Sequence, residues 1–258
     1  MNKVSAVLVS FNEEEKIEAA LRSLQGVSDE IIVVDSFSTD ATEKICRQYV
    51  DQFFQRPWEG YRTQKQFATQ QANHEWVLSL DADEVLSPEL QREISRWKEE
   101  AEDDVNGYLL PRKTYFLGRW IEHTTWYPDW QLRLFRGSKG EWKGGRVHES
   151  FKVRGRIARL KGELYHFTYS SLKEYLVQLE RFSSLSAADY YDRGVRARPS
   201  HLLLQPPLVF VKNYCLRLGF LDGVPGLAAS GLSATSTFFK YLKLWELQLK
   251  RKADDTPA

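Results

Sequence analysis

The sequence has little cysteine and no long hydrophobic segment. Its 258 residues include two cysteines, Cys46 and Cys215, which do not form a C-x-x-C pair. Isolated cysteines suit a reducing compartment, and their spacing excludes a structural zinc site built from paired cysteines. No uninterrupted apolar run reaches the roughly 18 residues that a membrane-spanning helix needs. The N-terminal apolar run is short and is followed at once by glutamates, unlike a secretory signal peptide. We therefore expect a cytoplasmic protein.

Net charge is also low, at +1, so the composition does not indicate a nucleic-acid partner. The charges are nevertheless unevenly distributed. Between Arg196 and Lys252 nine basic residues stand against two acidic ones, Asp222 and Glu246, among many Leu, Phe, Tyr and Val. This composition is typical of helices on an anionic membrane surface, and a solvated helical hairpin is the alternative. We expect peripheral attachment to the inner face of the cytoplasmic membrane through residues 196–258.

The N-terminal part alternates between strand and helix patterns. Apolar, largely β-branched runs predict buried strands at 4–11, 30–36 and 76–83, and 50–56 is interpreted as a further short strand. Amphipathic patterns predict helices at 12–24, 38–49, 61–73 and 87–100. The expected N-caps are Asn12 for the first helix, Thr39 or Asp40 for the second, and Ser87, followed by Pro88, for the fourth.

This alternation predicts an α/β fold with a mostly parallel sheet and right-handed crossovers. In such sheets ligands bind beyond the carboxyl ends of the strands. The polar residues that follow the strands should therefore line one edge; they are Ser10, Asn12, Asp35, Ser36, Asp81 and Asp83.

After Gly107 the pattern changes to short, aromatic, Arg-rich segments, which we interpret as antiparallel strands added to the sheet. A strong amphipathic helix follows, capped by Ser170 or Ser171, and then at least two further helices. Breaks are expected at Pro206-Pro207 and at 222–226. We accordingly divide the chain into 1–195, with halves at 1–105 and 106–195, and a helical segment at 196–258.

The sequence "WVLSLDADEV" places two carboxylates, Asp81 and Asp83, at the end of an expected buried strand. Crowded carboxylates require a neutralising cation. A D-x-D pair supplies the hard oxygen ligands that Mg²⁺ or Mn²⁺ prefers and leaves coordination positions open for a diphosphate. An acidic turn ahead of a helix cap is the alternative interpretation.

Three segments, "SAVLVSFNEE", "EIIVVDSFSTDAT" and "WVLSLDADEV", resemble in order and spacing the nucleotide-binding half of GT-A family 2 glycosyltransferases. The segments "DWQLRLFR", "GGRVHES", "LYHFTYSSLKEYL" and the C-terminal "GFLDGVPGL" resemble the branch that contains lipopolysaccharide-core β-glucosyltransferases. The resemblance covers nearly the whole chain. It implies an inverting, metal-dependent transfer of a hexose from a nucleotide sugar, with UDP as the nucleotide, to a glycan or glycolipid.

The resemblance also implies roles for individual residues. Ser10, Asn12 and Glu13 would lie against the nucleoside, and Asp35 would bind the uracil or ribose. Lys65 would lie near the diphosphate, although Gln66 replaces the asparagine that often follows in the family. Asp81 would approach the ribose or sugar, and Asp83 would bind the metal. His166 matches the position of a late metal-binding histidine.

An inverting transfer needs a base that deprotonates the acceptor hydroxyl. Glu149, in "RVHES", is the first candidate and Asp129 the second; the acidic pair common in the family is replaced here by His148-Glu149. His148 would orient Glu149 or contact phosphate. Arg133 and Arg136 would suit the donor diphosphate or an anionic acceptor through bidentate contacts, and strand-surface pairing is their alternative role.

Two other function classes remain open. A nucleotidyltransferase would share the parallel sheet and acidic metal ligands, but "SFNEEEK" is not the Gly-rich basic loop expected after its first strand. A non-catalytic sugar-nucleotide-binding protein would have lost the base, which the presence of Asp81, Asp83, Glu149 and His166 disfavours.

Overall fold

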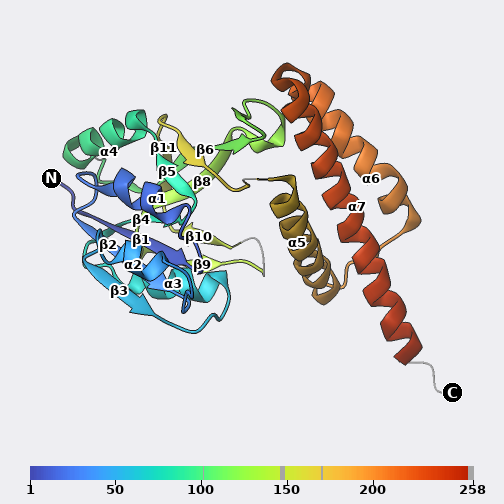
Figure 1. Cartoon of the computed structure of the whole chain (residues 1–258), viewed down its shortest axis with the longest axis horizontal. Helices are drawn as coiled ribbons and strands as arrows, with labels where there is room; N and C mark the ends of the chain where they lie inside the picture. Colours follow the sequence, from blue (N-terminus) through green and yellow to red (C-terminus); the bar gives the residue numbers. More distant parts are fainter. Residues whose placement is uncertain (101, 146–148, 170, 255–258) are drawn as a thin grey trace. The chain divides into compact units, whose positions relative to one another are not determined.

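The structure is a computed structural model that describes residues 1–100, 102–145, 149–169 and 171–254. The chain divides into two compact units, which are described separately (Figure 1). Unit 1 comprises residues 1–114, 129–144 and 148–168, and unit 2 comprises residues 115–128, 145–147 and 169–258. The boundary expected from the sequence, between 195 and 196, falls within unit 2.

Unit 1 begins with the predicted alternation of strands and helices. The strands are β1 (Val4–Ser10), β2 (Glu30–Asp35), β3 (Gln52–Gln55) and β4 (Trp76–Asp81). The helices are α1 (Ile17–Leu24), α2 (Thr42–Cys46), α3 (Tyr61–Gln71) and α4 (Pro88–Glu100). The four strands pair in parallel in the order β3-β2-β1-β4, which confirms the predicted parallel sheet.

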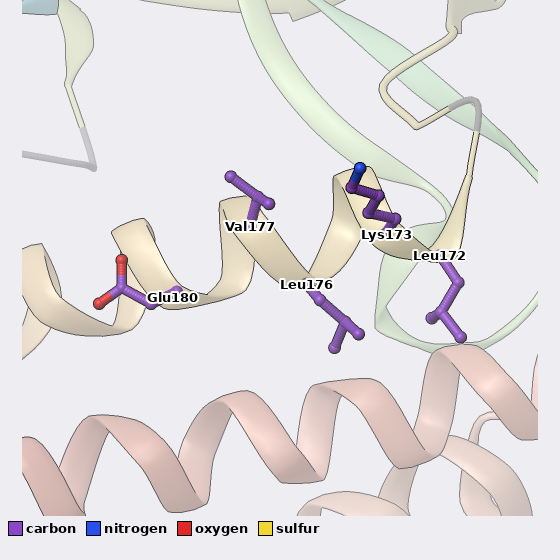
Figure 2. Close-up of a pocket in the computed structure, with 5 residues that line it drawn as sticks. All are labelled: Leu172, Lys173, Leu176, Val177 and Glu180. Atoms are coloured by element: carbon purple, nitrogen blue, oxygen red, sulfur yellow. The ribbon is translucent and has the colours of Figure 1, made fainter.

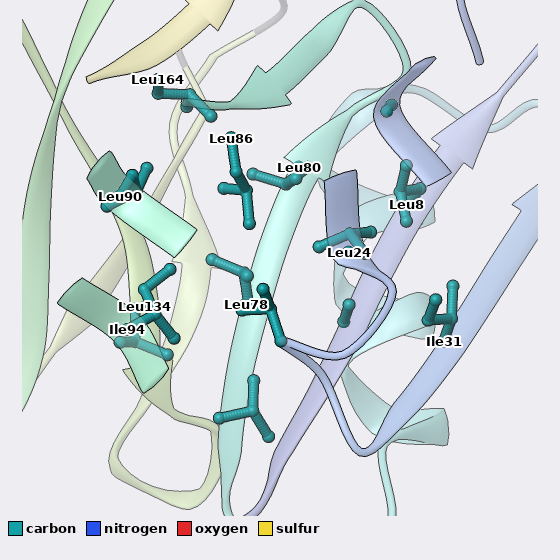
Figure 3. Packing of buried hydrophobic residues seen from close by; sticks show 14 of the residues in the cluster. Leu8, Leu24, Ile31, Leu78, Leu80, Leu86, Leu90, Ile94, Leu134 and Leu164 are labelled. Carbon is teal, nitrogen blue, oxygen red and sulfur yellow. The ribbon is translucent and has the colours of Figure 1, made fainter. Parts of the chain in front are cut away.

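The sheet is buried on both faces, as the continuous apolar runs predicted. Successive residues of β1, such as Val7 and Leu8, point to opposite faces of the sheet. The Leu8 face packs against α1 and α4, and the Val7 face packs against α3 and the β9–β10 hairpin (Gly140–Lys143 and Ser150–Val153). Figure 3 shows the first cluster, in which leucine and isoleucine side chains from strands and helices interdigitate.

The aromatic, Arg-rich region adds strands to this sheet. They are β6 (Val105–Phe116), β7 (Arg119–Trp120), β8 (Asp129–Arg136), β11 (Arg156–Arg159) and β12 (Leu164–His166). A further strand, β5 (Glu84–Leu86), follows the D-x-D motif and joins the sheet by pairing with β12. The antiparallel prediction is confirmed for β8, which lies between β4 and β6. It is wrong for one side of β12, which pairs in parallel with β6. Strand β11, which the sequence pattern did not predict, also pairs in parallel with β6.

The helix caps agree with the sequence in part. Ser87 caps α4 by accepting a hydrogen bond from the Leu90 amide at 3.1 Å, as predicted. Ser171 caps α5 (Leu172–Asp192) in the same way, whereas Ser170 lies outside the described residues. The predicted cap of α2 at Thr39 or Asp40 is wrong, because the helix begins at Thr42 with Ala41 at the N-cap. The Asp40 side chain accepts a hydrogen bond from the Thr42 amide at 3.0 Å.

Unit 2 is mainly helical. Beside α5 it contains α6 (Pro199–Val211) and α7 (Gly223–Asp254), with short turns η1 (Thr124–Trp126), η3 (Lys212–Leu216) and η4 (Gly219–Asp222); η2 (Gly137–Lys139) belongs to unit 1. Both α5 and α6 pack against α7. A small core joins Phe116 and Ile121 to Tyr175 and Leu179.

The predicted break at Pro206-Pro207 is wrong, because α6 continues through both prolines. The prolines cannot donate to the carbonyls one turn earlier, but their fixed φ is compatible with a helix. The chain leaves the α-helical pattern after them, in the π-helical turn η3. The predicted break at 222–226 is confirmed in position, since η4 ends and α7 begins there.

Helix α5 carries a pocket of about 730 Å³ lined by Leu172, Lys173, Leu176, Val177 and Glu180. Leu172 and Leu176 point toward α7, whereas Val177 points away from it (Figure 2). The lining is apolar apart from Lys173 and Glu180.

Among the described residues, no helix combines the length and apolar character needed to cross a membrane.

Candidate active site

Polar residues converge where the parallel strands end. Ser10 is the last residue of β1 and pairs in register with Asp35, the last residue of β2. On the other side of β1, Val9 pairs with Asp81, the last residue of β4. The sequence prediction that these side chains share one edge is therefore confirmed.

Asp35 is fully buried at this edge and accepts three hydrogen bonds. Ser10 Oγ donates to it at 2.9 Å, the Ser38 amide at 2.7 Å and Ser38 Oγ at 2.5 Å. These bonds fix the carboxylate against the first residues of the loop that follows β2. Ser10 and Asp35, both predicted to contact the nucleoside, are therefore hydrogen-bonded to each other.

The loops after β1 and β2 are joined by reciprocal hydrogen bonds. The Asn12 amide donates to Ser38 Oγ and the Thr39 amide donates to Asn12 Oδ1, both at 2.8 Å. The predicted N-cap role of Asn12 is wrong, because α1 begins at Ile17 and Asn12 has a φ of 54°. Its side chain holds the neighbouring loop instead. Glu13 belongs to the same arrangement, since its amide donates to Thr42 Oγ1 at 2.8 Å.

Asp81 lies between two buried cations. Lys65 Nζ is 2.7 Å from its Oδ1, and the Arg133 guanidinium contacts its Oδ2. The Asp81 side chain is 27% exposed, whereas those of Lys65 and Arg133 are 4% and 5% exposed. Burial by itself would raise the pKa of the Asp81 carboxyl, but the charges of Arg133 and Lys65 outweigh it and hold that pKa well below its usual range.

Asp81 belongs to a longer series of alternating charges. From Lys65 it extends to Glu149 Oε1 at 2.9 Å, and from Arg133 to Glu84 Oε1 at 2.6 Å. Glu84 then pairs with Arg112 Nη1 at 3.0 Å, and Arg112 Nη2 with Asp129 at 2.6 Å. We call this series the charge chain; its members are Glu149, Lys65, Asp81, Arg133, Glu84, Arg112 and Asp129.

Two cationic side chains of the protein itself, Lys65 and Arg133, neutralise the first carboxylate of the D-x-D motif, Asp81. Lys65 and Arg133 were predicted to face a diphosphate, and the structure engages both with carboxylates. Sequence analysis did not single out Glu84 or Arg112. Glu84 is fully buried, and its Oε2 also accepts a hydrogen bond from the Asp81 amide at 3.1 Å. Its position directly after the D-x-D motif was the available signal.

The second carboxylate of the motif, Asp83, faces the predicted histidine. His166 Nε2 lies 3.3 Å from Asp83 Oδ2, and the Phe167 amide donates to the Asp83 carbonyl at 2.9 Å. The pairing of β5 with β12 produces this contact, since His166 stands opposite Glu84 in register. Burial would raise the pKa of Asp83, but His166 outweighs it and lowers that pKa.

The two candidate bases occupy opposite ends of the charge chain. Glu149 contacts Lys65, and its side chain is 12% exposed. Asp129 contacts Arg112 and is 33% exposed. His148, predicted to orient Glu149, lies outside the described residues. Arg136, the other predicted anion contact, pairs with Glu75 at 2.9 Å on the strand surface.

Residues 5–158 match the family model of glycosyl transferase family 2. The chain is 30% identical over 252 residues to the lipopolysaccharide core biosynthesis glycosyltransferase LpsC of Rhizobium meliloti, covering 92% of this chain and 93% of the relative. It is 30% identical over 262 residues to an uncharacterized glycosyltransferase of Rickettsia typhi, covering 98% of this chain and 90% of that protein.

Among solved structures, the mannosyltransferase PcManGT of Pyrobaculum calidifontis, in complex with GDP-Man and Mn²⁺, has a TM-score of 0.53 at 16% identity, covering 98% of this chain and 88% of that one. This similarity supports the GT-A fold of the mixed sheet described above. The match of residues 5–158 to the family model and the 30% identity to LpsC over nearly the whole chain show that the chain belongs to glycosyl transferase family 2.

Proposed function

We propose that this glycosyltransferase transfers a hexose from a UDP-sugar, with inversion at the anomeric carbon, to a glycan or glycolipid of the lipopolysaccharide-core type. The observation that carries the proposal is the ion pair of Glu149 with Lys65, which in turn holds Asp81 at the carboxyl edge of the sheet. A carboxylate held beside the D-x-D motif is the arrangement that donor binding and base catalysis both require. The acceptor class follows that of the Rhizobium meliloti relative, a lipopolysaccharide core biosynthesis glycosyltransferase.

Each part of the site then has a chemical role. Ser10, Asn12, Glu13 and Asp35 form the nucleoside surface. Glu149 takes the proton of the acceptor hydroxyl, whose oxygen forms the new bond to the anomeric carbon. The bond from that carbon to the donor diphosphate breaks, and the nucleoside diphosphate leaves with the electron pair. Lys65 and Arg133 position Asp81 in this scheme, because both are buried and engaged with carboxylates.

Asp83 and His166 fit a divalent cation as two neighbouring ligands. Among the described residues, no cluster of three or more His, Cys, Asp or Glu side chains could hold a metal by itself. The separation of 3.3 Å between Asp83 Oδ2 and His166 Nε2 is close to the edge of an octahedron with bonds of about 2.1 Å, which is about 3.0 Å. Two protein ligands leave positions for diphosphate oxygens and water. A bound Mg²⁺ or Mn²⁺ would neutralise charge on the leaving diphosphate.

A thermal-shift panel of nucleotide sugars, with and without Mn²⁺, followed by a transfer assay on glycan and glycolipid acceptors, tests the proposal. We expect a UDP-hexose to raise the melting temperature in a metal-dependent way and to give a glycosylated product. Donor binding without any product would favour the non-catalytic alternative. Release of pyrophosphate from a nucleoside triphosphate and a sugar phosphate would favour the nucleotidyltransferase.

The proposal places the enzyme at the inner surface of the cytoplasmic membrane, where it would meet a lipid-linked acceptor. The support is the excess of basic over acidic residues from Arg196 onward, interleaved with aromatic and aliphatic side chains.

A further inference from the structure

Helix α6 is an apolar helix that exposes most of its surface. Its 13 residues contain no Asp, Glu, Lys or Arg, and none of them is buried. It packs against α7, beside which it lies in Figure 1. An uncharged helix with a single face covered is not a stable arrangement in water unless a further apolar partner covers the rest.

The exposed face of α6 consists of leucines and continues into the turn that follows. Leu203, Leu204 and Leu208 are 72%, 58% and 60% exposed. Beyond the helix, Leu216 is 75% exposed and Val224, at the start of α7, is 74% exposed. Large apolar side chains grouped on one side of a helix at this exposure mark an interaction surface rather than ordinary surface variation.

The charges around this face select its partner. Exposed basic residues flank α6 on both sides, Arg196 and Arg198 before it, Lys212 and Arg217 after it. The single acidic residue between 196 and 245, Asp222, is 1% exposed and accepts hydrogen bonds from His123. The segment 196–245 therefore combines exposed apolar and positive groups without an exposed carboxylate, and the next acidic residue, the exposed Glu246, is paired with Lys250. This combination matches an anionic lipid surface.

We propose that α6 lies in the plane of an anionic membrane, with its leucines in the boundary between headgroups and acyl chains and its flanking cations among the headgroups. The proposal rests on the membrane placement given above and names the element responsible. At about 1.5 Å per residue, α6 is about 20 Å long, shorter than the roughly 30 Å hydrocarbon core.

The two prolines of α6 favour the interface over the hydrocarbon core. Pro206 and Pro207 have no amide hydrogen to donate to the carbonyls of Leu202 and Leu203 in the helical pattern. In the headgroup region water can satisfy those carbonyls, whereas in hydrocarbon they would be costly. The sequence thus suits a helix that lies on a membrane.

The test is sedimentation of the full chain with vesicles of phosphatidylcholine, with or without phosphatidylglycerol. We expect binding to the anionic vesicles and at least a tenfold loss in the double variant Leu204→Asp/Leu208→Asp. Ile157→Asp, at an apolar position of unit 1 that is 43% exposed, is the matched control and should bind as the unchanged protein does. Lys212→Gln/Arg217→Gln should lose about 25-fold at low salt, at about fivefold for each basic residue. Lys44→Gln/Lys152→Gln removes the same charge elsewhere and should lose far less.

Unchanged vesicle binding by Leu204→Asp/Leu208→Asp would overturn the proposal. So would a loss of self-association in that variant, measured by analytical ultracentrifugation, while vesicle binding persists, since the face would then belong to a second copy of the chain. Calorimetric titration with UDP-glucose in the same variants separates this inference from the proposed function. We expect the leucine variant to retain the donor binding of the unchanged protein.

Discussion

Replacing Arg133 by leucine should test whether the charge chain organises the site. Arg133 contacts two carboxylates, and Glu84, one of them, is fully buried. Removing one partner from a buried ion pair costs about 3–5 kcal/mol. Lys65 still neutralises Asp81 and Arg112 still neutralises Glu84, so we expect the lower end, about 3 kcal/mol.

At about 2–4 °C per kcal/mol for a protein of this size, the Arg133→Leu variant should melt about 6–12 °C lower. Arg92→Leu is the matched control. Its side chain is 68% exposed and pairs with Glu89, and exposed pairs contribute little, so its melting temperature should hardly change. Differential scanning calorimetry of the three proteins at neutral pH measures both effects.

The loss of stability in Arg133→Leu should depend on pH in a defined direction. The native pKa of Asp81 is below its unfolded-state value, so its ion pairs stabilise the fold above about pH 4 and that stability is lost as the pH falls further. Arg133→Leu removes part of this depression. The difference in melting temperature between the variant and the unchanged protein should therefore stay nearly constant down to about pH 4 and shrink as the pH falls below it. A loss under about 1 kcal/mol at neutral pH, or a difference that does not shrink on acidification, would refute a stabilising charge chain.

Three further predictions concern the reaction. Asp83→Ala should abolish transfer and metal-dependent nucleotide binding; normal transfer in the presence of a chelator would remove Asp83 from the metal site. Glu149→Gln should bind donor normally but lose at least about a hundredfold in kcat, the usual contribution of a general base. Near-normal transfer by Glu149→Gln, together with an inactive Asp129→Asn, would move the base to Asp129. His166→Ala should raise the Mn²⁺ concentration needed for half-maximal activity while leaving donor binding at saturating metal intact, and an unchanged requirement would exclude His166 as a ligand.

Local patterns predicted much of unit 1. Continuous apolar runs identified β1, β2 and β4, because a parallel strand buried on both faces needs apolar side chains at nearly every position. The edge strand β3 is only partly buried, and its sequence is less apolar. Because these strands run in the same direction, the sequence also predicted that the polar residues after them lie at one edge of the sheet. The parallel pairing of β11 and β12 with β6 depends on contacts between segments distant in the sequence, and no local pattern in a short strand encodes its partner.

The sequence predicted which residues form the candidate site but not how their side chains contact one another. Asp81, Lys65, Arg133 and Glu149 were all selected, but their arrangement as alternating charges was not. A lysine or arginine near an acidic motif suits a phosphate or a carboxylate equally well by chemistry, and only the side-chain positions distinguish the two. Glu84, which links Arg133 to Arg112, resembles an ordinary turn glutamate in the sequence.

The reciprocal hydrogen bonds of Asn12 with Ser38 and Thr39 have a consequence for ligand binding. They hold the loops after β1 and β2 in place without a bound nucleotide sugar. The loops that form the surface proposed for the nucleoside therefore need not become ordered when UDP binds. Donor association should therefore proceed in a single kinetic phase, and changes to the nucleoside base should alter the dissociation rate more than the association rate. Specificity for the nucleotide would then be a property of a rigid template, whereas adaptation to different acceptors would fall to other parts of the chain.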